Sequence, residues 1–268
     1  MTALAALASI ATLVTFLFNW QTENNSSEFS AFLTLGIIGL CLFYAMAMMS
    51  MKKRILLTLN PRFEITIEQG DLFKKRGIIV IPVNEYFDTI VDDEIISSSS
   101  VHGKWIRNVW GCDILKLDAL IEEEIKSRKY DLDSHRKRGK NKKYELGECV
   151  RIDVPENGNT YVLFALTHFD PDNHAYLKHE DFPKVMDRLM DYLAGIANEK
   201  QVYMPLFGTG LSRLNRSPQR ILTFMLDAID FKHSDRSFPN GLFIELYSMN
   251  NIDLNQIEEL FLNNIHQE

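Results

Sequence analysis

Residues 78–83 read IIVIPV, an apolar run with no polar interruption. Such a run is typical of a central strand that is buried on both faces of a sheet. Residues 63–69 alternate apolar and polar side chains, as a half-buried strand does. Residues 161–166 and 242–247 are two further strand candidates. Because these β-rich runs alternate with amphipathic helices, the sequence predicts an α/β layer fold.

The helices of this fold are marked by periodicity and by capping residues. Apolar side chains recur at helical spacing through residues 182–198, which predicts a helix with one buried face. Ser217 followed by Pro218 is typical of a helix start, and Asp253 with Gln256 three residues later resembles a capping box. The whole pattern gives about six strands and four or five helices, enough for one closed domain of roughly two hundred residues.

Charge and cysteine content exclude several classes of protein. A formal net charge of -7 argues against a protein that coats nucleic acid, because such proteins need a surplus of Lys and Arg on one face. Cys41, Cys112 and Cys149 are odd in number and far apart, so we expect reduced, buried thiols and neither a disulfide framework nor a metal-ligand pair. The basic stretch 134–143 (SHRKRGKNKK) is expected in an exposed loop, either solvated or in contact with lipid headgroups or a nucleotide phosphate.

The N-terminal part of the chain differs in composition from the rest. Residues 3–20 and 29–51 are uncharged runs, each of roughly the twenty residues with which a helix crosses a membrane. The polar link 21–28 is too short for a folded element, so we predict a transmembrane helical hairpin with Trp20 at the interface. A buried helical hairpin of a soluble protein is the alternative interpretation.

The predicted orientation follows from Lys52, Lys53 and Arg54, which come directly after the second apolar run. Basic residues at the end of a span are retained on the cytoplasmic side, in agreement with unpaired cysteines. A signal peptide would need a basic n-region and an A-x-A-like cleavage site, and neither is present. The expected organisation is therefore two transmembrane helices with a basic cytoplasmic flank in residues 1–54, and one α/β domain in residues 61–268.

Three short motifs end predicted strands of this domain. IEQGDLF at residues 67–73 ends in Gly-Asp-hydrophobic, IVIPVNE at residues 79–85 leads into an asparagine, and YMPLFGTGL at residues 203–211 runs into a Gly-Thr-Gly turn. A diphosphate needs backbone N–H groups at close range, and glycines such as Gly208 and Gly210 permit that approach. In this order the motifs resemble those of macro domains, which are ADP-ribose-binding α/β/α folds.

The resemblance covers nearly all of residues 62–268 and implies a three-layer α/β/α domain with a mixed central sheet. In macro domains, the aspartate of the first motif accepts a hydrogen bond from the adenine amino group, the asparagine lies near the distal ribose and the glycine turn lies against the phosphates. ADP-ribosyl hydrolases of the macro class carry a glycine-rich loop followed by an acidic residue, where this chain has SSSSVHG at residues 97–103. A positioned catalytic acid is not evident there.

The site implied by the resemblance binds a ligand and holds no metal, no further cofactor and no catalytic residue. Its expected ligand-binding residues are Asp71, Leu72, Val83, Asn84, Val101, His102, Gly103, Leu206, Phe207, Gly208, Thr209, Gly210, Leu211 and Ser212. The alternatives without ligand binding are a turn-capping role for Asp71 and Asn84 and a position in a surface loop for His102. His168 and Asp170 also follow a buried strand, where either a site or a capped turn is expected.

SVHG, ALTHFD at residues 165–170 and PLFGTGLSRL are most similar to the macro-like module of Thoeris anti-phage systems. Some effectors of those systems join two transmembrane helices to this module. The resemblance implies a multi-pass effector in the bacterial inner membrane, with its N-terminus and macro domain in the cytoplasm. It also implies activation by an ADP-ribose conjugate, of which a histidine conjugate is one candidate, made from NAD by a partner TIR-domain enzyme.

Binding of the conjugate is expected to promote homo-oligomerisation and damage to the lipid bilayer. Two alternatives stay open at this point. One is a membrane-anchored ADP-ribosyl hydrolase, in which the asparagine and a bound water perform the chemistry. The other is an assembly scaffold whose pocket has decayed.

Overall fold

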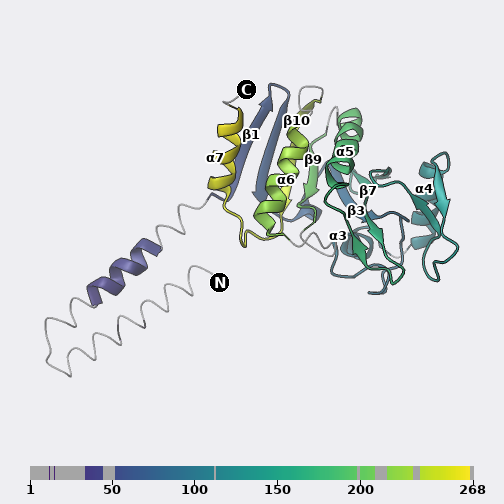
Figure 1. Cartoon of the computed structure of the whole chain (residues 1–268), viewed down its shortest axis with the longest axis horizontal. Coiled ribbons are helices and arrows are strands. Elements are labelled where there is room, and N and C mark those ends of the chain that lie inside the picture. The colour runs from purple at the N-terminus through teal and green to yellow at the C-terminus, as the bar shows by residue number, and fades with distance from the viewer. Residues whose placement is uncertain are drawn as a thin grey trace. The chain divides into compact units, whose positions relative to one another are not determined.

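Figure 1 shows the computed structural model of the chain. The chain forms two compact units, Met1–Lys52 and Lys53–Glu268. The residues that the structure describes are 12, 15, 34–44, 52–111, 113–197, 200–208, 216–231 and 236–265.

A mixed sheet of eight strands, counted over the described residues, forms the middle of the second unit (Figure 1). In order across the sheet the strands are β1 (Arg54–Asn60), β2 (Phe63–Gln69), β10 (Phe238–Leu246), β9 (Val202–Pro205), β3 (Ile78–Asn84), β7 (Asn159–Phe169) and β6 (Cys149–Val154), with β8 (Ala175–Tyr176) paired to β7. The five strands from β2 to β7 are parallel, whereas β1 and β6 pair antiparallel at the two edges. The carboxyl ends of the five parallel strands therefore lie at one edge of the sheet.

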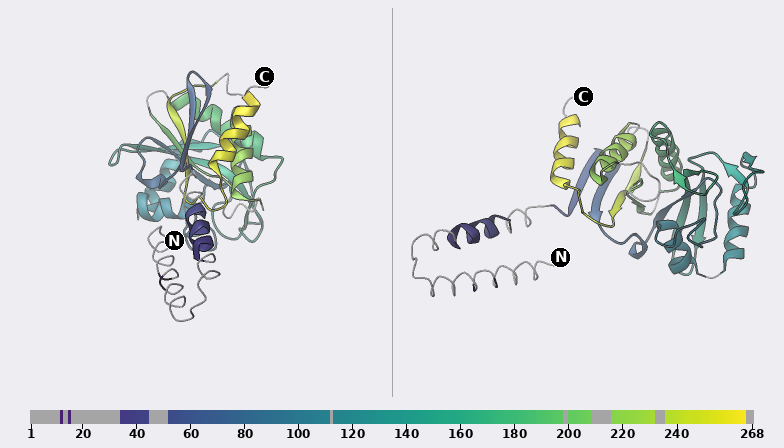
Figure 2. Two further views of the ribbon diagram at one scale, coloured as in Figure 1. Left: turned by 90° about the vertical axis from the view of Figure 1, so that its left-hand side faces the viewer. Right: turned by 60° about the horizontal axis from the view of Figure 1, so that its bottom comes forward.

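Helices cover both faces of this sheet, which gives the predicted three layers. The helices on one face are α5 (Phe182–Ile196), α6 (Pro218–Asp230) and α7 (Leu254–Ile265), and those on the other are α3 (Val101–Trp105), the π-helical turn η2 (Ile106–Trp110) and α4 (Ile114–Ile125). The left panel of Figure 2 shows the yellow α7 on one side of the sheet and the teal helices on the other. A short 3-10 helix, η1 (Leu72–Lys74), follows β2, and a separate ribbon pairs β4 (Tyr130–Leu132) with β5 (Lys142–Tyr144).

Two hydrophobic cores lie between the layers. Along β3, Ile78 and Val80 join the core under α5 and α6, whereas Ile79, Ile81 and Val83 join the core under α3 and α4. This alternation follows from the period of two along a strand. Because both faces of β3 are covered, its sequence is apolar throughout apart from its end, as the central-strand interpretation requires.

The strongest predicted elements are confirmed. β2 occupies the predicted residues 63–69, β3 extends the run 78–83 by one residue to Asn84, and α5 ends two residues before the predicted end of the helix over 182–198. The edge strand β1 was not predicted, since Arg54 was assigned to the basic flank and residues 55–60 were assigned to neither part of the chain. It begins directly after the boundary between the two units.

The capping residues act largely as predicted. Ser217 accepts the backbone N–H three residues on at 3.4 Å, and α6 begins at the proline that follows it. Asp253 accepts the backbone N–H of Gln256 at 3.4 Å, but the return bond of a capping box does not form. Instead, the backbone N–H of Asp253 donates to Gln219 of α6 at 2.9 Å, so α6 and α7 share the cap.

The basic stretch 134–143 is not simply an exposed loop, contrary to the prediction. The side chain of Arg136 is only 5% exposed and its Nη2 lies 2.6 Å from Oδ2 of Asp88, which is itself buried. The guanidinium also lies over the ring of Tyr86, 3.8 Å from its centroid, and the backbone N–H of Lys140 donates to Asp88. The charge run gave no sign of this anchor, because the carboxylate that receives Arg136 is far away in the sequence.

The cysteines fit the prediction in part. Cys149 is free and buried, and burial raises the pKa of its thiol. Cys41 is free and partly exposed, and Cys112 lies outside the described residues.

The first unit is described over residues 12, 15 and 34–44, all of which are helical. Within that described part, no helix is both long enough and apolar enough to cross a membrane. Most of the two predicted spans, residues 3–20 and 29–51, lies outside the described residues.

Candidate functional site

Three of the predicted ligand-binding positions lie where parallel strands end at one edge of the sheet. Asp71 follows β2, Asn84 is the last residue of β3, and Gly208 comes shortly after β9. We call Asp71, Asn84 and Gly208 the strand-end site. Because β2, β9 and β3 run in the same direction, and η1 contacts β9, the topology delivers these residues to the same edge, where α/β folds commonly bind ligands.

Asp71 caps η1. Its Oδ1 accepts the backbone N–H of Phe73 at 3.1 Å, and its Oδ2 lies 3.8 Å from the Lys74 ammonium. The side chain is 49% exposed, so the turn holds one carboxylate oxygen without burying the carboxylate. The turn-capping role and a ligand-binding role are thus compatible. Leu72, the next predicted residue, is buried and belongs to the core under α3 and α4.

The turn that carries Asp71 is fixed to β10 by a buried carboxylate that the sequence did not reveal. A Cβ added at Gly70 would come within 2.0 Å of Oε2 of Glu245, so only glycine permits this approach. Lys75 Nζ lies 2.8 Å from Oε1 of Glu245 and 2.7 Å from Glu68. Burial raises the pKa of the Glu245 carboxyl, while the Lys75 ammonium opposes that shift.

Asn84 is buried, and its Oδ1 accepts the backbone N–H of Tyr86 at 2.9 Å and that of Asp88 at 3.5 Å. These bonds fix the orientation of the amide. Its NH2 group makes no hydrogen bond to any described residue, so it is a donor available to a ligand. Val83, one residue earlier, is buried in the core and supports this position.

The predicted segment 101–103 begins α3. Ser100 caps this helix by accepting the N–H of Gly103 at 2.9 Å. A Cβ added at Gly103 would come within 2.2 Å of the carbonyl oxygen of Ser97, so this glycine has a packing role. Val101 packs at the edge of the same core, and α3 contacts β3.

His102 is not a surface histidine, since it is only 6% exposed. Burial, together with the charge of Lys140, lowers the pKa of His102 to about 3, so the ring is neutral at physiological pH. Its Nε2 is buried and has no hydrogen-bond partner among the described residues. An unpaired buried nitrogen of this kind costs free energy unless a further group meets it.

The glycine turn is described only in its first half. Leu206 packs against the core under α5 and α6, and Phe207 is buried with its ring 5.6 Å from that of Phe164. Gly208 has φ of +84°, the left-handed region that favours glycine. The remaining predicted residues of the turn, Thr209, Gly210, Leu211 and Ser212, lie outside the described residues.

A cleft of about 440 Å³ has a lining that contains none of Asp71, Asn84, His102 and Gly208. We call it the His168 cleft. The ionisable residues that line it are Glu85, Lys129, Asp131, Lys143, Glu145, His168, Asp181 and Lys184. Its walls come from the ends of β3 and β7, the β4–β5 ribbon and the start of α5.

The floor of the His168 cleft is a carboxylate–histidine pair. Glu85 is fully buried, and its Oε2 lies 2.5 Å from Nδ1 of His168. Its Oε1 accepts the backbone N–H of Phe169 at 3.1 Å and lies 3.3 Å from Lys143 Nζ. His168 was a candidate site residue from the sequence, whereas Glu85 was not predicted. Its position directly after Asn84, at the end of a buried strand, was the signal in the sequence that could have indicated a buried carboxylate.

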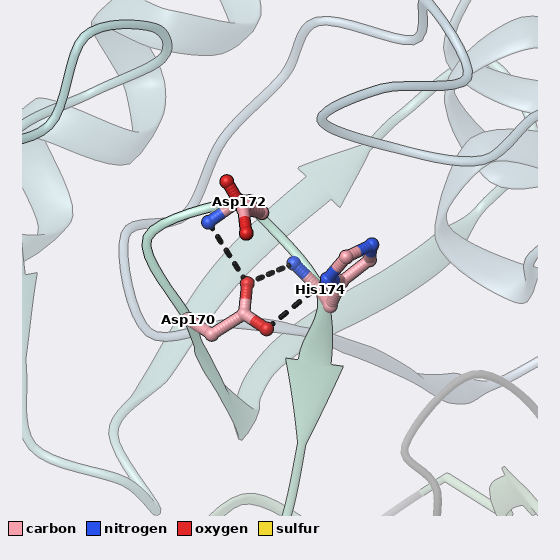
Figure 3. A group of neighbouring side chains, drawn as sticks. All are labelled: Asp170, Asp172 and His174. Carbon is pink, nitrogen blue, oxygen red and sulfur yellow. Dashed lines mark hydrogen bonds and ion pairs between the residues drawn. The ribbon is translucent and has the colours of Figure 1, made fainter.

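Asp170, in contrast, caps a turn. Figure 3 shows Asp170, Asp172 and His174 gathered in the turn between β7 and β8. Asp170 accepts the backbone N–H groups of Asp172 and His174 at 2.9 and 2.8 Å, and His174 Nδ1 lies 3.1 Å from its other oxygen. The three side chains could meet at a cation. Because Asp170 is already used by the turn, the capped-turn interpretation accounts for the group without one.

The fold places the second unit in the macro class. It is similar to solved structures of the Oceanobacillus iheyensis macrodomain with ADP, at a TM-score of 0.55 and 12% identity over 79% of this chain and 97% of that one. The same macrodomain with MES bound gives a TM-score of 0.54 at 12% identity over 80% of this chain and 97% of that one. At this identity the likeness shows the fold alone.

Residues 65–247 match the family model of "Thoeris protein ThsA, Macro domain", and the chain belongs to that family. It is 32% identical to the Thoeris protein ThsA of Bacillus amyloliquefaciens (strain Y2) over 163 residues, which are 59% of this chain and 52% of the relative. The chain thus spans about half the length of this curated relative.

Proposed function

We propose that the chain is a membrane-anchored effector of Thoeris anti-phage defence, and that its macro domain binds an ADP-ribose-derived nucleotide at the strand-end site. The observation that carries the proposal is the arrival of Asp71, Asn84 and Gly208 at one edge of the sheet on parallel strands. Two comparisons support it. The family is that of a Thoeris protein, and solved structures with the same fold contain ADP or ADPR.

Each residue of the strand-end site offers a group that suits one part of such a ligand. Oδ2 of Asp71, on a half-exposed side chain, is an acceptor for the adenine amino group, because the turn already occupies Oδ1. Gly208, with its positive φ, lets backbone N–H groups approach a diphosphate. The Asn84 amide is held by its oxygen, so its NH2 group is left to donate to a ribose hydroxyl.

The effector function requires that the ligand bind one assembly state more tightly than another, since a ligand with equal affinity for both shifts nothing. In this proposal the apolar runs 3–20 and 29–51 anchor the chain in the inner membrane, with the macro domain in the cytoplasm. A TIR-domain enzyme supplies the signal, for which a histidine conjugate of ADP-ribose is a candidate. Binding then drives homo-oligomerisation and disruption of the bilayer.

Calorimetric titration of the full chain in detergent with ADP-ribose tests the binding step. We expect saturable binding with no product formed. A flat titration with ADP-ribose and its conjugates would remove the proposal. Steady turnover of an ADP-ribosylated substrate, with release of ADP-ribose, would instead establish the membrane-anchored ADP-ribosyl hydrolase.

The effector step is tested in cells that express the full chain, with and without a TIR enzyme that makes the signal. We expect loss of membrane potential only when both are present, and none from a variant that lacks residues 1–51. Depolarisation without the signal, or with the shortened variant, would contradict the proposed coupling of the two units.

A further inference from the structure

A lysine reaches across the edge of the sheet on which the strand-end site lies. Lys104 is a half-buried residue of α3, and its Nζ lies 4.9 Å from the centroid of the Tyr247 ring. Tyr247 directly follows β10 and is 85% exposed. The contact therefore joins a helix of one layer to the end of a central strand through an exposed ring.

The position of this contact follows from the order of the strands. β10 and β9 lie between β2, which leads to Asp71, and β3, which ends at Asn84. The backbone N–H of the residue before Asp71 donates to the carbonyl oxygen of Leu246 at 3.1 Å, so Tyr247 begins beside the Asp71 turn. On the other side, α3 contacts β3. Lys104 thus extends from the Asn84 side of the site towards the Asp71 side.

The ammonium of Lys104 is not engaged by a carboxylate. Among the residues that the structure describes, its contact is with the Tyr247 ring, and it forms no ion pair. The lysines of the Asp71 turn differ, since Lys74 Nζ lies 3.8 Å from Asp71 Oδ2 and Lys75 is paired with two glutamates. A ring contact at an exposed position contributes little, so Lys104 can exchange it for a stronger charge-assisted hydrogen bond.

A nucleotide bound in the proposed way has its diphosphate in the middle of the site. With the adenine at Asp71 and the distal ribose at Asn84, the diphosphate that joins them lies near the ends of β10 and β9, where Lys104 reaches. The chain carries a formal net charge of -7, which opposes the approach of an anion. Backbone N–H groups at Gly208 offer only partial positive charges. A lysine at this position supplies the full charge that they lack.

From this geometry we infer that Lys104 is a binding residue for the diphosphate, to which its ammonium donates a hydrogen bond in place of its contact with the Tyr247 ring. The inference rests on the proposed function and names the cation that the chain itself provides for the ligand. The strand-end site then selects a diphosphate by charge as well as by backbone geometry.

Calorimetric titration of the full chain in detergent with ADP-ribose tests the assignment in three variants. Lys104→Gln removes the charge, so affinity should fall at least about tenfold, the scale of one charge-assisted hydrogen bond. Lys104→Arg keeps a cation with N–H donors and should stay within about threefold of the natural chain. Lys116→Gln is the matched control. Its Nζ lies 5.9 Å from the centroid of the Trp110 ring, but on α4, which contacts β6 at the other edge of the sheet, so its binding should be unchanged.

Salt separates a contact with the ligand from a structural role of Lys104. Raising the ionic strength from about 0.1 M to about 1 M shortens the Debye length from about 10 Å to about 3 Å. Binding of ADP-ribose to the natural chain should therefore weaken more than binding to Lys104→Gln. If the glutamine variant lost affinity through a change in packing alone, the two salt dependences would be the same.

The inference is overturned by an unchanged affinity in Lys104→Gln, by an equal loss in Lys116→Gln, by a loss in Lys104→Arg as large as in Lys104→Gln, or by equal salt dependences. In each of these outcomes the natural chain still binds ADP-ribose, so the proposed function stands. A natural chain that does not bind ADP-ribose or its conjugates would instead remove the proposed function, and the inference with it.

Discussion

The strand-end site and the His168 cleft lie at the carboxyl ends of parallel strands of one sheet and share only β3, and their side chains are held in opposite ways. Asp71 and Asn84 bond to backbone N–H groups two residues further on. Glu85 and His168 are joined across 83 positions of sequence, and Lys143 and Phe169 complete their network. A residue held by its own turn can change without moving other elements, whereas a residue that links several elements cannot. Substitutions should therefore separate ligand binding from stability at the first region and couple them at the second.

The largest expected effect comes from the buried ion pair between Asp88 and Arg136, which holds the basic stretch 134–143. Asp88→Ala leaves the Arg136 guanidinium buried without its carboxylate, and we expect a loss of about 3 to 5 kcal/mol in the free energy of unfolding. Denaturant unfolding of the full chain measures this. The control is Glu122→Ala, which breaks a half-exposed pair with Lys142 and should cost about 1 kcal/mol. Similar losses in both variants would mean that the buried pair is not the anchor.

At the strand-end site the expected effect is on affinity. Asp71→Ala should weaken ADP-ribose binding by about 1 to 3 kcal/mol, because the adenine amino group would lose its acceptor. Asp113→Ala is a matched control, since Asp113 caps α4 as Asp71 caps η1, accepting the N–H of Lys116 at 3.0 Å. Both variants lose a helix cap, so a drop in affinity confined to Asp71→Ala assigns it to the ligand. An unchanged affinity in that variant would remove Asp71 from the site.

His102 was predicted with the strand-end residues but is buried like the residues of the cleft floor. Its pKa in the folded chain is about 3, below its ordinary value of 6.5, so between these values the unfolded chain binds a proton that the folded chain excludes. Stability should thus be complete above about pH 6.5 and fall as the pH is lowered towards 3, by at most about 1.4 kcal/mol per pH unit.

Unfolding of His102→Leu at several pH values checks this effect. The slope of stability against pH should flatten over this range relative to the natural chain, whereas His179→Leu, at an exposed position, should leave it unchanged. An identical slope in His102→Leu would show that the buried ring does not contribute to acid lability.

The same contrast between local and long-range contacts explains how much could be predicted. The central strand, α5 and the Ser217 cap were found because each is a local pattern of apolar spacing or capping chemistry. The motifs that contain Asp71 and Asn84 are local patterns of the same kind, and the ligand-binding role of these two residues stays a prediction. Glu85 and Arg136 were missed as buried groups, because their partners lie 83 and 48 positions away.

Pairing partners at the sheet edge were equally hard to predict. β1 reads as a mixed polar and apolar segment after a basic flank, and only its antiparallel pairing with β2 makes it a strand. Glu245 likewise shows its role only when β10 lies beside the turn at Gly70.

The most direct test of the strand-end site compares two glycines with ADP-ribose as the ligand. Gly208 and Gly158 have φ of +84° and +72°, so valine strains the backbone at both, but Gly158 precedes β7 at the opposite edge of the sheet. In calorimetric titrations of the full chain, Gly208→Val should abolish ADP-ribose binding, while Gly158→Val should bind as the natural chain does. Retained binding in Gly208→Val, or equal loss in both variants, would contradict the placement of the nucleotide at this edge.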